Sequence, residues 1–120
     1  MSDLMKLTLA GARDALRSGQ TTAVELTEAS LTAVAASKPL NVFVHNTSEI
    51  ALAQASAADL RLKVGGAPDM CGLPIGIKDL FCTKGVATQA ASAILKGFKP
   101  QYESTVSQKL FDAGAIMVGK

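Results

Sequence analysis

The sequence predicts an α/β fold in which helices cover a central mixed β-sheet. Segments with the spacing of an amphipathic helix alternate along the chain with short apolar runs of strand length. The 120 residues are enough for one modest domain. Hydrophobic residues make up 48% of the chain and charged residues 18%, which is typical of a globular protein and not of a disordered one.

Four segments repeat apolar residues at helical spacing. Thr8 is placed to cap the first segment and Gly19 to end it. The second covers about residues 22–37, the third lies between Thr47-Ser48-Glu49 and Gly65-Gly66, and the fourth between Ser104 and Gly114. The residues expected to face the core are Leu9, Ala12 and Leu16, then Val24, Leu31 and Val34, then Ile50, Ala53, Ala57, Leu60 and Val64, and finally Val106, Leu110 and Ala113.

Three short apolar runs predict strands, at residues 42–44, 74–81 and 115–118. A loop is expected at residues 64–72, which include three glycines and a proline. A short helix is expected between the second strand and the last helix. Lys120 directly follows the last apolar run, whereas chain termini usually extend into polar residues, so we expect residues 1–120 to be the first portion of a longer domain.

Charge and cysteine content exclude several classes of function. The 12 basic and 10 acidic residues are interspersed, so no basic stripe indicates direct nucleic-acid binding. No run of about eighteen apolar residues is present, so no membrane span is expected. Cys71 and Cys82 lack partners at the spacing of a zinc site, and we interpret them as two reduced thiols.

Residues 73–81 are the stretch most able to carry chemistry, because Lys78 lies there in an apolar run. A lysine that points inward loses hydration, which lowers its pKa and allows the neutral amine to act as a general base. The pattern alone favours the alternative, an exposed lysine that pairs with a nearby carboxylate. Gly76 marks a place where another backbone or a ligand approaches closely.

The same stretch resembles the lysine motif of the amidase signature family. The resemblance begins at residues 73–92, LPIGIKDLFCTKGVATQAAS. Three further stretches resemble the family in the same order: LTLAGARDALRSGQTTAVELTEASL, LNVFVHNTSEIALAQASAADLRL and YESTVSQKLFDAGAIMVGK. Because the resemblance extends over essentially the whole chain, it is more specific than a single motif. It implies the amidase-signature fold, with residues 1–120 as the N-terminal portion of one domain that ends before the Gly/Ser-rich signature.

The resemblance also implies a Ser–cis-Ser–Lys triad in which Lys78 is the base of the charge relay. A bridging serine passes the proton, and a second serine attacks the amide and forms an acyl-enzyme. Neither serine matches a position in these 120 residues, so we expect no nucleophile, and no amidase activity, in this chain alone. Ser92, Ser104 and Ser107 are expected to cap helices or to pack in the core.

Asp79 also matches the family motif, directly after the base. Two interpretations remain open for it. It orients the site from behind Lys78 through hydrogen bonds to the backbone, or it only caps a local turn.

Within the family, residues 91–95 and 102–106 are most similar to the branch that supplies the A subunit of glutamyl-tRNA(Gln) amidotransferases. This resemblance implies a cytoplasmic ligase complex in which glutamine is hydrolysed to supply ammonia for converting Glu-tRNA(Gln) to Gln-tRNA(Gln). Subunits B and C would be partners. The tRNA would contact mainly the partner, which would also bind ATP and Mg²⁺, and this chain would hold no cofactor. The alternatives are a stand-alone amidase for small amides and a segment that only packs or binds.

Two further features resemble functional motifs but have simpler explanations. Residues 114–120, GAIMVGK, match the G-x-x-x-x-G-K part of a nucleotide-binding loop, yet the intervening residues are themselves the predicted strand. Nucleotide binding is therefore the weakest hypothesis. His45 is the only histidine, and we interpret it as a residue at a strand end and not as a catalyst.

Overall fold

The computed structural model describes residues 3–120. Within this range the chain forms four α-helices, two strands and three short 3₁₀-helices. In order these are η1 (Asp3–Lys6), α1 (Leu9–Ser18), α2 (Ala23–Ala36), η2 (Lys38–Leu40), α3 (Ser48–Val64), β1 (Pro74–Gly76), η3 (Ala93–Leu95), α4 (Thr105–Asp112) and β2 (Ile116–Gly119). The four predicted helices are confirmed, and η3 occupies the place of the predicted short helix.

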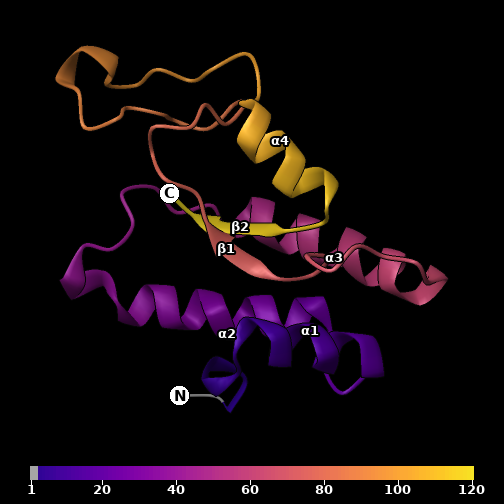
Figure 1. Ribbon diagram of the computed structural model, residues 1–120. Coiled ribbons are helices and arrows are strands. Elements are labelled where there is room, and N and C mark those ends of the chain that lie inside the picture. The colour runs from indigo at the N-terminus through magenta and orange to yellow at the C-terminus, as the bar shows by residue number, and fades with distance from the viewer. Residues whose placement is uncertain (1–2) are drawn as a thin grey trace.

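The two strands lie between layers of helices. They pair in parallel, with Pro74 opposite Ile116 and Gly76 opposite Gly119. An isolated antiparallel bridge, outside these two strands, joins Asn46 to Gly119. A parallel pair requires a crossover connection, and here that connection contains α4. In Figure 1, α4 lies on one side of the strands and α1 and α2 on the other. Helix α3 packs against both α2 and β2.

Local hydrogen bonds set the ends of the helices where the sequence predicted them. The hydroxyl of Thr8 accepts a hydrogen bond from the Gly11 amide, and Gly19 ends α1 in the left-handed conformation. Thr22 and Glu25 form a reciprocal capping box at the start of α2. A contact from outside the helix adds to it. The carboxylate of Asp59, on α3, accepts hydrogen bonds from the first two amides of α2, at 2.7 and 3.2 Å.

The prediction of which face of α3 is buried was wrong. The predicted core residues Ile50, Ala53, Ala57, Leu60 and Val64 are all exposed, and Val64 is 88% exposed. The residues that face the core are Ala51, Ala55 and Ala58. Their small side chains allow the α3 backbone to approach α2 and β2 closely, whereas larger residues on this face would hold the elements apart.

In α4 the prediction also placed the wrong side chain in the core. Ser107 is fully buried, whereas Val106 is 47% exposed. The hydroxyl of Ser107 is buried without penalty because it hydrogen-bonds to the Glu103 carboxylate at 2.7 Å and to the Ser104 hydroxyl at 2.6 Å. Ser104 caps α4, so these two serines have the capping and packing roles that were expected. Ser92 precedes η3 without forming a side-chain cap.

Of the three predicted strands, the first is absent and the second is shorter than expected. Residues 42–44 form no strand, because only Asn46 reaches a β-bridge. Their apolar pattern reflects the packing of Phe43, whose ring lies over two glycines of the strand pair. A Cβ atom on Gly119 would lie 2.6 Å from Cδ1 of Phe43, and one on Gly76 would lie 3.2 Å from Cε1. The close approach predicted at Gly76 is therefore made by an aromatic ring.

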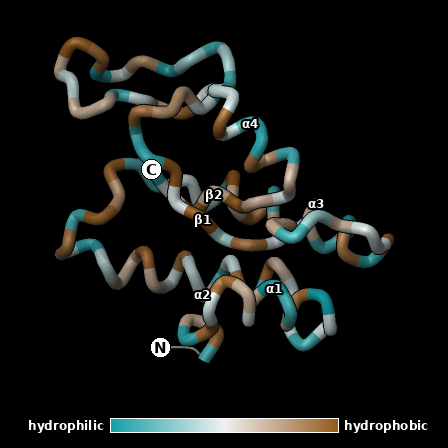
Figure 2. The backbone as a smooth tube through the Cα atoms, in the orientation of Figure 1, coloured by the Kyte–Doolittle hydropathy of each residue, from teal (hydrophilic) through white to brown (hydrophobic). Residues whose placement is uncertain are grey.

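The strand predicted at residues 74–81 ends at Gly76, so Lys78 lies beyond β1 and not within it. The segment that follows, residues 77–104, contains only η3 as regular structure. In Figure 1 it extends away from the strands as a long loop, shown in orange, and Figure 2 shows hydrophobic residues at its tip, where η3 lies. The last predicted strand is confirmed to within one residue, and Ala115 to Lys120 are all buried.

No helix within residues 3–120 has the length and apolar character needed to cross a membrane.

Replacing Asp59 by alanine is expected to destabilise the protein by about 2 kcal/mol, because two amides at the N-terminus of α2 lose a charged acceptor. Chemical denaturation of the purified protein measures this loss. Glu28→Ala is the matched control, since Glu28 is exposed on α2. An Asp59→Ala variant as stable as this control would contradict the role of the cap.

The reassigned face of α3 leads to a second prediction. Ala55→Leu is expected to cost about 1–3 kcal/mol of unfolding free energy, because extra methylenes force α3 away from its neighbours. Ala57→Leu, on the exposed face, should change the stability by less than about 0.5 kcal/mol. Both variants are compared by chemical denaturation. Equal stability of the two would contradict the assignment of the buried face of α3.

Candidate active site

The carboxyl ends of β1 and β2 place several charged residues at one edge of the strand pair. The ladder extends one step past the strands, since the Ile77 amide donates to the Gly119 carbonyl at 3.1 Å. Lys78 and Asp79 follow β1 directly, and Lys120 follows β2. Because both strands run in the same direction, these residues meet at the same edge, which is where ligands bind in many α/β folds.

Lys78 is exposed within residues 3–120. Its carbonyl accepts a hydrogen bond from the Phe81 amide at 3.1 Å, which forms a tight turn immediately after the strand. Of the two interpretations of the sequence pattern, the exposed lysine is therefore the one observed in these residues. The role of Lys78 as a base stays a prediction.

Asp79 turns inward, with only 15% of its side chain exposed. One carboxylate oxygen, Oδ2, accepts a hydrogen bond from the Gln89 amide at 3.2 Å, and the Asp79 carbonyl accepts one from the Ala90 amide at 2.8 Å. The predicted contact with backbone is present, and it reaches ten residues along the chain instead of capping its own turn. Asp79 thereby closes the loop that begins at Lys78.

The buried lysine at this edge is Lys120, whose side chain has no exposed surface. Its ammonium donates hydrogen bonds to the Phe81 carbonyl at 2.9 Å and to the Thr88 hydroxyl at 2.7 Å. The same nitrogen lies 3.7 Å from Oδ1 of Asp79. Burial lowers the pKa of Lys120, and the nearby Asp79 carboxylate opposes this effect.

His45 reaches the same carboxylate from a different segment. Its Nε2 atom lies 3.7 Å from Oδ1 of Asp79, and both atoms are buried without a hydrogen-bond partner. Backbone hydrogen bonds between His45 and Lys120, in both directions at 3.0 Å, hold this segment beside the end of β2. His45 therefore lies next to the candidate site and not at a free strand end.

Sequence reasoning missed Lys120 and Thr88 as members of this cluster. One signal for Lys120 was available: like Lys78, it follows a short apolar run. The contact with Thr88 carried no such signal, since it depends on how the intervening loop folds back.

Ala90 and Ala91 are strained where this loop returns from Asp79. Their φ angles are +49° and +58°, in the left-handed region that is disfavoured for residues with a Cβ atom. Backbone strain of this kind persists only where surrounding contacts impose it, and it is concentrated near functional sites. The hydrogen bonds from Gln89 and Ala90 to Asp79 are the contacts that impose it here.

Several other features contribute no group to this cluster. Residues 114–120 do not form a phosphate-binding loop, because their centre is β2 and the Lys120 ammonium is used inside the protein. Cys71 and Cys82 are free thiols, as predicted. Among residues 3–120, no three His, Cys, Asp or Glu side chains are grouped closely enough to hold a metal ion.

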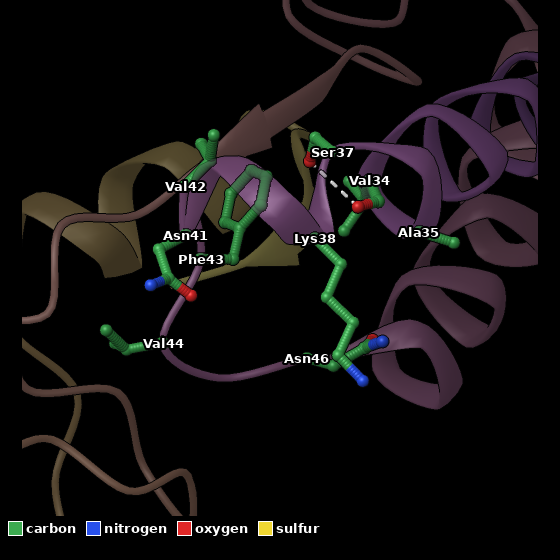
Figure 3. A pocket seen from close by; sticks show the side chains of 9 residues that line it. All are labelled: Val34, Ala35, Ser37, Lys38, Asn41, Val42, Phe43, Val44 and Asn46. Atoms are coloured by element: carbon green, nitrogen blue, oxygen red, sulfur yellow. Dashed lines mark hydrogen bonds between the residues drawn. The ribbon is translucent and has the colours of Figure 1, made fainter.

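A cavity of about 350 Å³ lies at the C-terminal end of α2. Figure 3 shows its side chains, which come from α2, η2 and the segment that leads to α3. The residues that line it are Val34, Ala35, Ser37, Lys38, Asn41, Val42, Phe43, Val44 and Asn46. Lys78, Asp79 and Lys120 are not among them, so we assign no part of the candidate chemistry to this cavity.

Comparison with known families supports the fold. A family model described as Amidase matches residues 25–120, and the chain belongs to this family. The A subunit of the glutamyl-tRNA(Gln) amidotransferase of Ruegeria sp. (strain TM1040) is 69% identical over 120 residues. The protein of the same name from Roseobacter denitrificans is 66% identical over the same length. The alignments cover all of this chain and 24% of each relative, so the chain spans about a quarter of their length.

A solved structure supports the fold assignment independently. The native peptide amidase from Stenotrophomonas maltophilia superposes with a TM-score of 0.87 at 28% sequence identity. The superposition covers 96% of this chain and 24% of that enzyme. The predicted α/β class and the family resemblance are therefore confirmed.

Relief of strain in the loop can be measured directly. Ala91→Gly is expected to raise the free energy of unfolding by about 1 kcal/mol, because glycine adopts the left-handed conformation without a Cβ clash. Ala87→Gly, in the same loop but without a positive φ angle, should instead lower it by about 0.5–1 kcal/mol. Chemical denaturation of both variants provides the comparison, and a loss of stability in Ala91→Gly would contradict the strain.

Proposed function

We propose that the protein carrying this chain is the glutamine-hydrolysing A subunit of a tRNA-dependent amidotransferase that converts Glu-tRNA(Gln) to Gln-tRNA(Gln). The observation that carries this proposal is the high identity with two proteins of that name over every residue of the chain. Residues 1–120 would be the N-terminal portion of the amidase domain, and they would supply the base and its surroundings.

In the proposed reaction Lys78 accepts a proton through a bridging serine, and a second serine attacks the side-chain amide carbon of glutamine. The relay returns the proton to the amide nitrogen, the C–N bond breaks and ammonia leaves, and water then hydrolyses the acyl-enzyme to glutamate. Both serines would come from outside residues 1–120. The exposure of Lys78 supports this arrangement, because an amine that must contact a serine elsewhere in the protein has to be free of its own segment.

The proposed complex would act in the cytoplasm with subunits B and C. Ammonia would pass to the partner that binds ATP and Mg²⁺, and this partner would use them to activate the glutamyl-tRNA, as expected of a ligase complex. The interspersed charges of residues 1–120, with a net charge of +2, support tRNA contact made mainly by the partner.

A stand-alone amidase for small amides is the second candidate. The similarity to a solved structure favours it, because an enzyme described as a peptide amidase has the same fold. The two candidates differ in whether ammonia release from glutamine requires the partner subunits.

The test is a glutaminase assay on the full-length protein assembled with subunits B and C. Lys78→Met is expected to lower kcat by about 10³-fold or more, because general-base catalysis contributes on the order of 10²–10⁴-fold and methionine cannot accept the proton. Lys84→Met is the matched control, since Lys84 is an exposed lysine in the following loop, and it should keep full activity.

An assembled Lys78→Met complex with normal activity would show that Lys78 is not the base. Hydrolysis of small amides by the wild-type protein, without glutaminase activity in any assembly, would favour the stand-alone amidase instead.

A further inference from the structure

Lys120 is the one residue of the cluster whose charged group is wholly enclosed by the protein. A buried ammonium is strongly destabilising unless it is paired and hydrogen-bonded. Lys120 meets both requirements through the Phe81 carbonyl, the Thr88 hydroxyl and the Asp79 carboxylate. These three partners belong to the segment that begins directly after Lys78.

The contacts of Lys120 therefore fix the segment that carries the proposed base. Phe81 and Thr88 are held at the two ends of the loop that follows the Lys78 turn. Asp79 lies between the ammonium and the Gln89 amide. Since Lys120 is the residue after β2, a rigid strand holds the other end of this connection.

Charge gives Lys120 a second effect on the base. A lysine that accepts a proton must be neutral, and a neighbouring carboxylate favours its charged form. Asp79 is such a carboxylate, directly next to Lys78 in the chain. The Lys120 ammonium lies 3.7 Å from Oδ1 of Asp79 and offsets the charge of this carboxylate, which is the neighbour of Lys78 in the chain.

The charged and titratable groups near this ammonium come from several segments. Asp79 is adjacent, and Cys82 and Glu103 also favour the charged form of Lys120. The Nε2 atom of His45 also lies 3.7 Å from Oδ1 of Asp79. A change in the charge of Lys120 therefore acts first on Asp79, the neighbour of Lys78 in the chain.

We propose that Lys120 is a positioning residue for Lys78: it holds the loop at residues 79–88 in place and balances the charge of Asp79. The proposal rests on the proposed function, in which Lys78 is the base. In this role Lys120 acts through Lys78, because its side-chain partners lie in the segment that directly follows the base.

The test is the pH dependence of kcat/KM for glutamine in the assembled full-length complex. The acidic limb of this profile reports the pKa of the essential base in the free enzyme. Lys120→Met removes the ammonium and leaves Asp79 unbalanced. We expect kcat/KM at neutral pH to fall at least tenfold and the acidic limb to move to higher pH by about one unit, the size of shift that one close charge produces.

The double variant Lys120→Met/Asp79→Asn removes both charges together. We expect its acidic limb to return to within a few tenths of a unit of the wild-type position, although the activity recovers only in part because the hydrogen bonds to Phe81 and Thr88 remain absent. Lys84→Met, which removes an exposed lysine from the same loop, should leave the profile unchanged.

A Lys120→Met enzyme that loses activity without a shift of the acidic limb would overturn the proposal, because a purely structural role predicts that result. If Lys120→Met does not fold, the double variant decides the matter. Recovery of folding on removing Asp79 as well supports the pairing, and failure to recover overturns it. The proposed function is tested separately, by the glutaminase activity of the assembled wild-type complex and by the loss of that activity in Lys78→Met.

Discussion

The parallel pairing of β1 with β2 determines where the chemistry of this chain can lie. It brings the residues that follow the two strands to one edge, although a long loop and a helix separate them in the sequence. The pairing itself depends on two glycines opposite one another, Gly76 and Gly119, because the Phe43 ring occupies the space that their side chains would need. The Phe43 ring packs on the strand pair. The segment that contains Phe43 also places His45 at the same edge.

The buried ammonium group of Lys120 holds this edge together. Such a charge gains nothing from burial by itself, and its environment must compensate for the lost hydration. Here the compensation is distributed over a carbonyl, a hydroxyl and a carboxylate of one loop, so that loop and strand are fastened to one another. Ala90 and Ala91 are strained where the same loop returns to Asp79, because hydrogen bonds from the Gln89 and Ala90 amides to Asp79 impose this conformation.

The ends of the helices could be predicted because capping is a local signal. Thr8, Thr22 and Ser104 each bond to an amide within three residues, so the sequence contains both partners. The buried face of α3 could not be predicted from large apolar residues, because the helix packs through alanines and exposes Leu60 and Val64. A pattern that weighs hydrophobic size selects the wrong side whenever close backbone approach decides the packing.

The same distinction separates what could be predicted of the candidate site from what could not. Lys78 and Asp79 were found through their motif, which is continuous in sequence. Lys120, Thr88 and His45 join them only through the parallel register and the folding back of the loop. The apolar run at residues 42–44 was misinterpreted as a strand, because only Phe43 packs inward, on two glycines, while Val42 and Val44 are exposed.

The most direct test of this account is a crystal structure of the full-length protein in complex with its partner subunits. The account predicts that the Lys78 amine lies within about 3 Å of a serine hydroxyl from outside residues 1–120, the distance of a hydrogen bond. It also predicts that the Lys120 ammonium stays on Phe81, Thr88 and Asp79. A structure in which Lys78 remains in solvent, or in which Lys120 instead contacts that serine, would contradict it.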